Sequence, residues 1–218
     1  MSTLDQLAIK YGTDKSSLIH NYCVKYQKYL PFNQKDPIKL LEIGVLDGNS
    51  LLTWGEYFPN SSIIGIDINP GCKQYEKDNI IIEIGSQVDE KFLKEVIEKH
   101  GPFDMILDDG SHLQSHMIKS FEILFPHVKN QGVYIVEDTC CAYWPEYEGG
   151  LNLPNTSIEY FKKLIDDVNF QGKYSSLPYS VARREDYLIP SIKNSNSNIR
   201  IDIESINFLN SIILINKR

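Results

Sequence analysis

Short apolar segments that alternate with segments of helical periodicity are the feature that most constrains the fold of this chain. The apolar segments are rich in Ile, Leu and Val, and they span residues 37–45, 62–68, 79–85, 103–108 and 132–138. Continuously apolar strands are typical of a parallel sheet that is covered by helices on both faces. The segments between them, such as 50–58 and 89–100, have the apolar spacing of helices. The alternation therefore predicts an α/β fold with a doubly wound, mostly parallel sheet.

The C-terminal part of the sequence departs from this alternation. Residues 199–208 and 211–217 are two β-rich runs separated by a short turn, which predicts a closing antiparallel hairpin. Before them, Thr156 and Glu159 have the spacing of a capping box and predict the start of a helix. No change in composition justifies a domain boundary, so we expect a single domain over residues 1–218.

The composition limits the partners of the protein. The formal net charge is −7, which provides no electrostatic footprint for nucleic acid and no polybasic patch for a membrane surface. No apolar run approaches the roughly 20 residues of a membrane span, and the N-terminus lacks the layout of a secretion signal. The four cysteines do not have zinc-binding spacing, and we interpret them as reduced thiols. We therefore expect a cytoplasmic protein that acts on small molecules.

The sequence LLEIGVLDGNS contains the clearest signal for a cofactor. A strand ends in Glu42, and Gly44 and Gly48 allow the chain to turn tightly into a helix. The dinucleotide fingerprint would require a further glycine at Leu46, where the backbone approaches a pyrophosphate. Its absence argues against NAD and favours a ligand without a phosphate at this turn.

Two further strand ends are consistent with an adenosine ligand. Asp67 ends the next strand, where its carboxylate could accept hydrogen bonds from both hydroxyls of a ribose. Ser86 and Gln87 follow the third strand, where an adenine edge would lie, although a simple polar turn explains them equally well. Together with the glycine loop they favour S-adenosylmethionine (SAM), since ligands bind at the carboxyl ends of strands in open α/β sheets. The alternative is a tight turn and an aspartate that caps the next one.

Acidic residues end two successive strands. If these strands are neighbours in the sheet, Asp109, Glu137 and Asp138 converge, and their mutual repulsion is relieved most simply by a divalent cation. An all-oxygen ligand set favours Mg²⁺. His112 follows Asp109 closely and is a candidate general base. For Asp108, one residue deeper in the strand, we expect a structural or cofactor-side role.

Five segments, in this order, resemble one enzyme family: LEIGVLDGNSLLTWGEYFP, IIGIDI, GSQVD, ILDDGSH and IVEDTCCAYWPEYEGG. The family is the metal-dependent class I SAM O-methyltransferases of macrolide and sugar tailoring, such as the mycinamicin and macrocin O-methyltransferases. The resemblance extends to YGTDKSSLIHNYCVKYQKYL near the N-terminus and to SINFLNSIILINK at the end, so it covers nearly the whole chain. It implies a Rossmann-like sheet of seven strands.

The resemblance also implies roles for individual residues. The family's metal ligands match Asp109, Glu137 and Asp138, and its general base matches His112. Its ribose-binding acid matches Asp67, and its glycine loop matches the stretch from Glu42 to Gly48. Residues 1–36 correspond to a helical cap that folds over the cofactor and acceptor. The cap carries two further candidates for cofactor binding, Tyr11 and Lys15.

The expected activity is Mg²⁺-dependent transfer of a methyl group from SAM to a hydroxyl of a sugar or sugar-bearing natural product. A catechol or phenol acceptor is an alternative, because it also offers neighbouring oxygens to Mg²⁺. A cephalosporin-hydroxylase-like protein and a non-catalytic SAM-binding protein are two others. The irregular segments 141–155 and 172–190 are candidates for the acceptor pocket or for a contact in a homo-oligomer. The sequence identifies neither the acceptor nor the oligomeric state.

Overall fold

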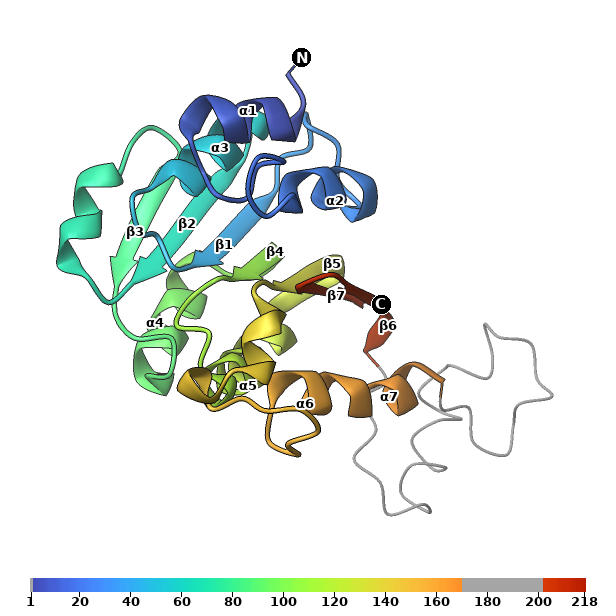
Figure 1. The fold of residues 1–218 in the computed structure, drawn as a ribbon. Coiled ribbons are helices and arrows are strands. Elements are labelled where there is room, and N and C mark those ends of the chain that lie inside the picture. Colours follow the sequence, from blue (N-terminus) through green and yellow to red (C-terminus); the bar gives the residue numbers. More distant parts are fainter. Residues whose placement is uncertain (1, 170–201) are drawn as a thin grey trace.

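The computed structural model describes residues 2–169 and 202–218. The segment 172–190 and the first residues of the expected hairpin lie outside this part of the chain. The described residues form a seven-stranded sheet in the order β3-β2-β1-β4-β5-β7-β6 (Figure 1). The strands are β1 (Lys39–Ile43), β2 (Ser62–Asp67), β3 (Ile80–Ile84), β4 (Phe103–Asp108), β5 (Val128–Val136), β6 (Ile203–Leu209) and β7 (Ile212–Lys217). The pairs among β1 to β5 are parallel, and β7 pairs antiparallel with β5 and β6, which confirms the predicted fold class.

Seven α-helices and four short 3₁₀ helices connect the strands in the described part of the chain. The α-helices are α1 (Leu4–Tyr11), α2 (Tyr22–Tyr29), α3 (Asn49–Tyr57), α4 (Glu90–His100), α5 (Gln114–Leu124), α6 (Ser157–Lys163) and α7 (Ile165–Asn169). The 3₁₀ helices are η1 (Pro70–Tyr75), η2 (Phe125–His127), η3 (Thr139–Tyr143) and η4 (Pro145–Tyr147). No helix among the described residues is long and apolar enough to cross a membrane.

Only half of the predicted capping box forms at the start of α6. The hydroxyl of Thr156 accepts a hydrogen bond from the backbone N–H of Glu159 at 3.4 Å. The carboxylate of Glu159 instead pairs with Lys162 on the next turn, 2.5 Å away. A complete capping box occurs at the start of α1, where Thr3 and Gln6 cap each other.

The core consists of two apolar clusters, one on each face of the sheet. Successive strand residues face opposite sides, so that Leu40 packs in one cluster and Leu41 in the other. Helices α1, α2 and α3 cover the first face, where Trp54 is fully buried, and α4, α5 and α6 cover the second, where Phe121 is fully buried (Figure 1). Burial on both faces explains why the strands are continuously apolar in sequence.

The register of the sheet brings the predicted site residues to one edge. Asp108 at the end of β4 pairs with Ile43 of β1 on one side and with Val136 of β5 on the other. The residues that follow these three positions therefore emerge side by side at the carboxyl ends of the strands. The expectation that β4 and β5 are neighbours is confirmed.

Candidate functional site

A cavity of about 380 Å³ opens at the carboxyl ends of the parallel strands. It lies between the glycine loop that follows β1 and the connection from β4 to α5, where α/β sheets bind their ligands. Nine residues predicted from the sequence line it: Lys15, Glu42, Gly44, Asp67, Ser86, Gln87, Asp109, His112 and Asp138. The cavity therefore joins the predicted cofactor residues to most of the predicted acidic group.

The two glycines of the loop are required by backbone geometry. Gly44 has φ +92°, and a Cβ at this position would lie 2.2 Å from the carbonyl oxygen of Asp109. Gly48, with φ +75°, precedes α3, and a Cβ there would lie 2.8 Å from the ring of Tyr75. Gly48 does not line the cavity, and it forms the turn into α3. Leu46, which stands where a dinucleotide fold has glycine, adopts φ 51° and is 80% exposed.

The carboxylate of Asp67 organises the glycine loop. Its Oδ2 accepts the backbone N–H groups of Val45 and Leu46 at 2.9 and 3.2 Å, and its Oδ1 accepts that of Asn69 at 2.8 Å. Burial alone would raise the pKa of this carboxyl, but these three backbone donors outweigh it and hold the pKa below its usual value. Asp67 therefore faces the cavity as a carboxylate, with about one of its four lone-pair sites left for a further donor.

Glu42 is the least satisfied polar group of the cavity wall. It is fully buried, and neither of its carboxylate oxygens has a hydrogen-bond partner among the described residues. Burial raises its pKa to about 7, against the attraction of the nearby Lys15 ammonium and of the Ser50 hydroxyl, which lies close by but outside normal hydrogen-bond geometry. Buried polar groups almost always have a partner, so an unpaired carboxylate facing a cavity indicates that a donor binds there.

Ser86, Gln87 and Asp108 have different surroundings at the end of β3 and β4. The Gln87 amide donates to Asp108 and Ser120 and accepts the backbone N–H of Ser111, so its polar atoms are engaged within the protein. Asp108 also accepts the hydroxyl of Tyr134 at 3.2 Å, and burial raises its pKa to about 6. Asp108 does not line the cavity, and its carboxylate contacts Gln87 and Tyr134 within the protein. Both Ser86 and Gln87 line the cavity, and the hydroxyl of Ser86 accepts the backbone N–H of Val88 at 3.4 Å.

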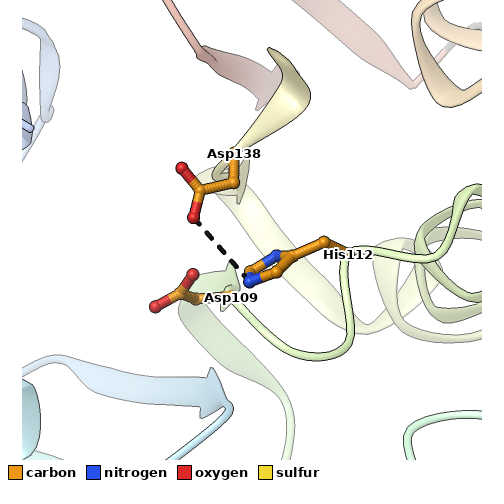
Figure 2. A group of neighbouring side chains, drawn as sticks. All are labelled: Asp109, His112 and Asp138. Atoms are coloured by element: carbon orange, nitrogen blue, oxygen red, sulfur yellow. Dashed lines mark ion pairs between the residues drawn. The ribbon is translucent and has the colours of Figure 1, made fainter. Parts of the chain in front are cut away.

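Asp109, His112 and Asp138 lie together at the ends of β4 and β5 (Figure 2). One potential ligand atom from each lies within 4.8 Å of the other two. Nε2 of His112 is 3.7 Å from Oδ2 of Asp138, and Nδ1 is buried without a partner in the described part of the chain. His112 and Asp138 have φ values of 58° and 49°. Non-glycine residues in this left-handed region are strained, and such strain is concentrated at functional sites.

Glu137 is not part of this group, but Lys15 contacts its carboxylate and that of Asp109 together, so the two acids converge as predicted. Glu137 is buried away from the cavity, and its oxygens accept hydrogen bonds from Lys15 at 2.5 Å and from the Tyr26 hydroxyl. Lys15 also donates to Asp109. Burial and the neighbouring Asp109 raise the pKa of Glu137 well above its usual value, with Lys15 opposing them. Glu137 and Asp109 therefore share the ammonium of Lys15.

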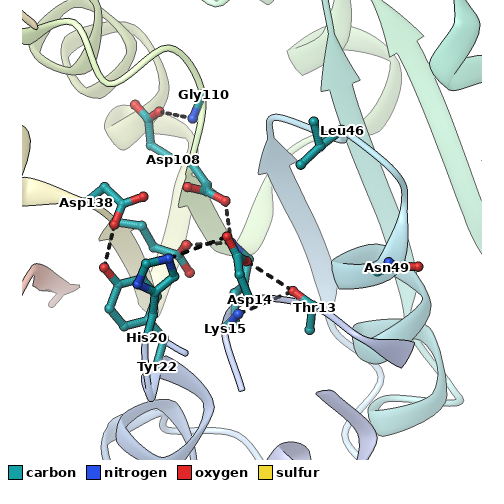
Figure 3. A network of polar contacts seen from close by, with 12 residues as sticks. Thr13, Asp14, Lys15, His20, Tyr22, Leu46, Asn49, Asp108, Gly110 and Asp138 are labelled. Carbon is teal, nitrogen blue, oxygen red and sulfur yellow. Dashed lines mark hydrogen bonds and ion pairs between the residues drawn. The ribbon is translucent and has the colours of Figure 1, made fainter. Parts of the chain in front are cut away.

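The N-terminal segment supplies the polar partners of the acidic residues. Lys15 and Tyr22 reach from this segment toward the strand ends (Figure 3). The hydroxyl of Tyr22 donates to Oδ1 of Asp138 at 2.5 Å, and burial together with this contact raises the pKa of the tyrosine. Lys15 is 3% exposed and does line the cavity, but its ammonium is directed at protein carboxylates.

Tyr11 does not line the cavity, although the sequence predicts a role for it in cofactor binding. It is the last residue of α1, and its hydroxyl contacts Glu56 on α3 at 2.5 Å, next to Lys10. Tyr22 and Tyr26 were missed as site residues, because nothing in their local sequence indicates that they contact strand ends. Ser111 and His116, whose side chains are 2.8 Å apart, also line the cavity.

The fold and the cavity are shared with known methyltransferases. The profile of a family described as a methyltransferase domain matches residues 41–139. The structure of the MycE methyltransferase from the mycinamycin biosynthetic pathway, in complex with Mg, SAH and mycinamycin VI, superimposes with a TM-score of 0.81 and 28% sequence identity. The superposition covers 99% of this chain and 54% of that chain. The fold is that of the class I methyltransferases.

Two curated proteins define the family more closely. The L-olivosyl-oleandolide 3-O-methyltransferase of Streptomyces antibioticus is 37% identical over 78% of this chain and 47% of its own length. The mycinamicin VI 2''-O-methyltransferase of Micromonospora griseorubida is 35% identical over 77% of this chain and 44% of its own length. Over about three quarters of its length the chain is similar to these sugar O-methyltransferases, which confirms the resemblance seen in its sequence. It spans about half the length of the curated relatives it matches.

Proposed function

We propose that the protein transfers a methyl group from SAM to a hydroxyl of a sugar-bearing small molecule with the help of Mg²⁺. The observation that carries this proposal is the shared cavity. It brings the glycine loop, Glu42 and Asp67 into the same space as Asp109, His112 and Asp138. The relatives named above are O-methyltransferases of sugar-bearing compounds, and MycE was solved with Mg and SAH.

The cavity fits the two ends of SAM. The unpaired carboxylate of Glu42 would accept the ammonium of the amino-acid end, and Asp67 would accept the ribose hydroxyls. Leu46, in place of a glycine, suits a ligand without a pyrophosphate at this turn. Ser86 would contact the adenine end. Gln87 supports this wall of the cavity through its hydrogen bonds to Asp108 and Ser120.

The acidic residues fit a hard dication. Asp109 and Asp138 already have ligand atoms close enough together to bind one ion. Glu137 and Asp109 both pair with the ammonium of Lys15. Carboxylate oxygens are the ligands that Mg²⁺ prefers. When bound, SAM supplies an electrophilic methyl group, and the dication supplies positive charge that favours ionisation of a nearby hydroxyl.

In the proposed reaction His112 acts as the general base. Its Nε2 faces Asp109 and Asp138, so that a hydroxyl placed among these residues would lose its proton to this atom. The oxygen–methyl bond then forms as the sulfur–methyl bond breaks, which leaves S-adenosylhomocysteine, the methyl ether and a protonated His112. Asp138 stabilises the imidazolium that results.

Tyr147 and Trp144 form an aromatic pair beside His112. The ring of Tyr147 lies 6.0 Å from that of His112 in an edge-to-face arrangement, and Trp144 lies 6.0 Å from Tyr147. Trp144 is 46% exposed, although its backbone is fixed by hydrogen bonds to Cys141 and from Gly149. A fixed, exposed aromatic surface beside a base suits an acceptor with an apolar face.

The test is formation of S-adenosylhomocysteine from SAM with a glycosylated macrolide or with catechol as acceptor, in the presence and absence of a chelator. We expect turnover of the glycoside that stops on metal removal and in Asp109→Asn. The control Asp104→Asn alters the other end of β4, where the carboxylate pairs with Lys129, and should retain activity. Turnover of catechol alone would indicate a phenol acceptor. Full activity with chelator would refute the role of the metal.

A further inference from the structure

A buried lysine contacts two of the carboxylates to which the proposed function assigns the dication. Lys15 Nζ donates to Oδ2 of Asp109 and to Oε2 of Glu137, and its side chain is 3% exposed. A buried ammonium is tolerated only where it is paired, and here two carboxylates pair with it. The Lys15 ammonium therefore lies between Asp109 and Glu137, where a bound dication would otherwise neutralise the two carboxylates.

The same lysine fixes the N-terminal segment over the cavity. Its backbone carbonyl accepts the N–H groups of Tyr22 and Cys23, both at 2.9 Å, which joins the turn to the start of α2. From α2, Tyr22 donates to Asp138 and Tyr26 donates to Glu137. Each of the three acidic residues thus receives a hydrogen bond from the N-terminal segment.

From this geometry we propose that Lys15 is a built-in competitor of the divalent cation. Mg²⁺ binds oxygen at about 2.0–2.1 Å. An ion bound to the two oxygens that Lys15 contacts would take the place of its Nζ atom, and a buried ammonium beside a dication would be repelled. Metal binding between Asp109 and Glu137 therefore expels Lys15 and loosens the segment from Thr13 to Cys23.

The competition links the metal to the cofactor, because Thr13, Asp14 and Lys15 line the same cavity as the glycine loop. The inference rests on the metal site of the proposed function and adds a competition by Lys15 that regulates it. Two measurements distinguish failure of the competition from failure of the proposed metal site.

The first measurement is calorimetric titration of MnCl₂ into the wild-type protein and into Lys15→Met. Removal of the competing ammonium should tighten Mn²⁺ binding at least ten-fold. Lys10→Met is the matched control, since Lys10 lies on the exposed surface of α1 and pairs with Glu56, and its affinity should equal that of the wild type. Equal or weaker binding by Lys15→Met would overturn the competition alone. No binding to any of the three proteins would overturn both the competition and the proposed metal site.

The second measurement needs no variant and so remains valid if Lys15→Met does not fold. Hydrogen exchange of the wild-type protein is followed with and without Mn²⁺. The amides of Tyr22 and Cys23, which bond to the Lys15 carbonyl, should exchange faster when the metal is bound. The amides of α4, on the opposite face of the sheet, serve as the internal reference. Unchanged or slower exchange at the two amides would contradict the release of the segment.

Discussion

Glu42 combines a negative charge with complete burial, and this combination makes the stability of the protein depend on pH. Its pKa is raised to about 7 in the folded state, from 4.5 for an unburied carboxyl, chiefly by burial. The folded state therefore binds this proton more tightly than the unfolded state does. The resulting stabilisation is complete below pH 4.5 and is lost as the pH rises through 7.

Glu42→Gln should therefore stabilise the cofactor-free protein more at pH 8 than at pH 5. A shift of this size corresponds to a difference on the order of 3 kcal/mol in the free energy of unfolding. Urea denaturation at the two pH values measures it, with Glu98→Gln on the exposed face of α4 as the control. The same variant should bind SAM more weakly, because it lacks the charge that pairs with the ammonium. An equal effect on stability at both pH values would show that Glu42 is not strained by burial.

His112 gives a second prediction about a single residue. His112→Ala should lower the rate of methyl transfer by about 10²–10⁴-fold, because the acceptor hydroxyl loses its base. Affinity for S-adenosylhomocysteine should be retained, since Glu42 and Asp67 are unchanged. Added imidazole should restore part of the rate if the side chain acts as a base. A rate that imidazole does not change would leave His112 with a purely structural role.

Gln114, at the start of α5, holds His112 in place, although its own side chain takes no part in the proposed reaction. Gln114 is buried, and its Nε2 donates to the backbone carbonyl of His112 at 3.0 Å. Its Oε1 accepts the backbone N–H and the hydroxyl of Ser157 at the start of α6, at 2.9 and 2.7 Å. One side chain thus joins two helix starts to the turn that carries the proposed base.

Gln114→Ala should loosen this junction and leave the Ser157 groups buried without a partner. We expect a loss of about 1–3 kcal/mol in the free energy of unfolding and a lower kcat. The affinity for S-adenosylhomocysteine should change little, because Gln114 does not line the cavity. Ser157→Ala removes only one of the two donors and should have a smaller effect on both quantities. Equal kcat in wild type and Gln114→Ala would show that the junction does not position His112.

The elements of the sheet could be predicted from sequence because their signals are local. The strand 103–108 was predicted with the bounds that β4 has, and α3 and α4 each begin within one residue of the predicted segments. The placement of the N-terminal helices could not be predicted in the same way. Lys15 reaches Asp109 and Glu137, which follow it by 94 and 122 residues, and no spacing in the sequence encodes such a contact.

The candidate site was predictable to the extent that the strand ends determine it. Asp67, Asp109 and Asp138 face the cavity because parallel strands end at one edge. The role of Gln87 could not be predicted, because its amide forms hydrogen bonds with β4, with α5 and with the loop between them. The direction of the Tyr11 side chain, which does not line the cavity, could not be predicted, because family resemblance locates a segment over the cavity but does not fix the direction of each side chain.

At the scale of the whole molecule, the two apolar clusters share the strands between them and should unfold together. Phe121 is fully buried and packs against four aromatic rings: Phe125, Tyr134, Tyr160 and Phe161. Phe121→Ala should cost about 3–5 kcal/mol of unfolding free energy, because it leaves a cavity in the second cluster.

Trp54 allows the loss to be measured from the opposite face. It is buried in the first cluster, whereas Trp144, the other tryptophan of the sequence, is exposed. In a Trp144→Phe background, Trp54 fluorescence and far-UV circular dichroism should shift to lower urea together in the Phe121→Ala variant. Fluorescence that keeps its wild-type midpoint while the dichroism shifts would mean that the faces unfold independently.

The position of β7 has a consequence for the folding of the protein during its synthesis. Glu137 and Asp138 directly follow strand β5, whose outer edge is paired by β7, which ends at Lys217. Until that late segment has been synthesised, the nascent chain presents an open strand edge made of Val133 to Val136, a template for pairing with other chains. Translation speed and chaperone supply should therefore matter more for the yield of this protein than its final stability suggests.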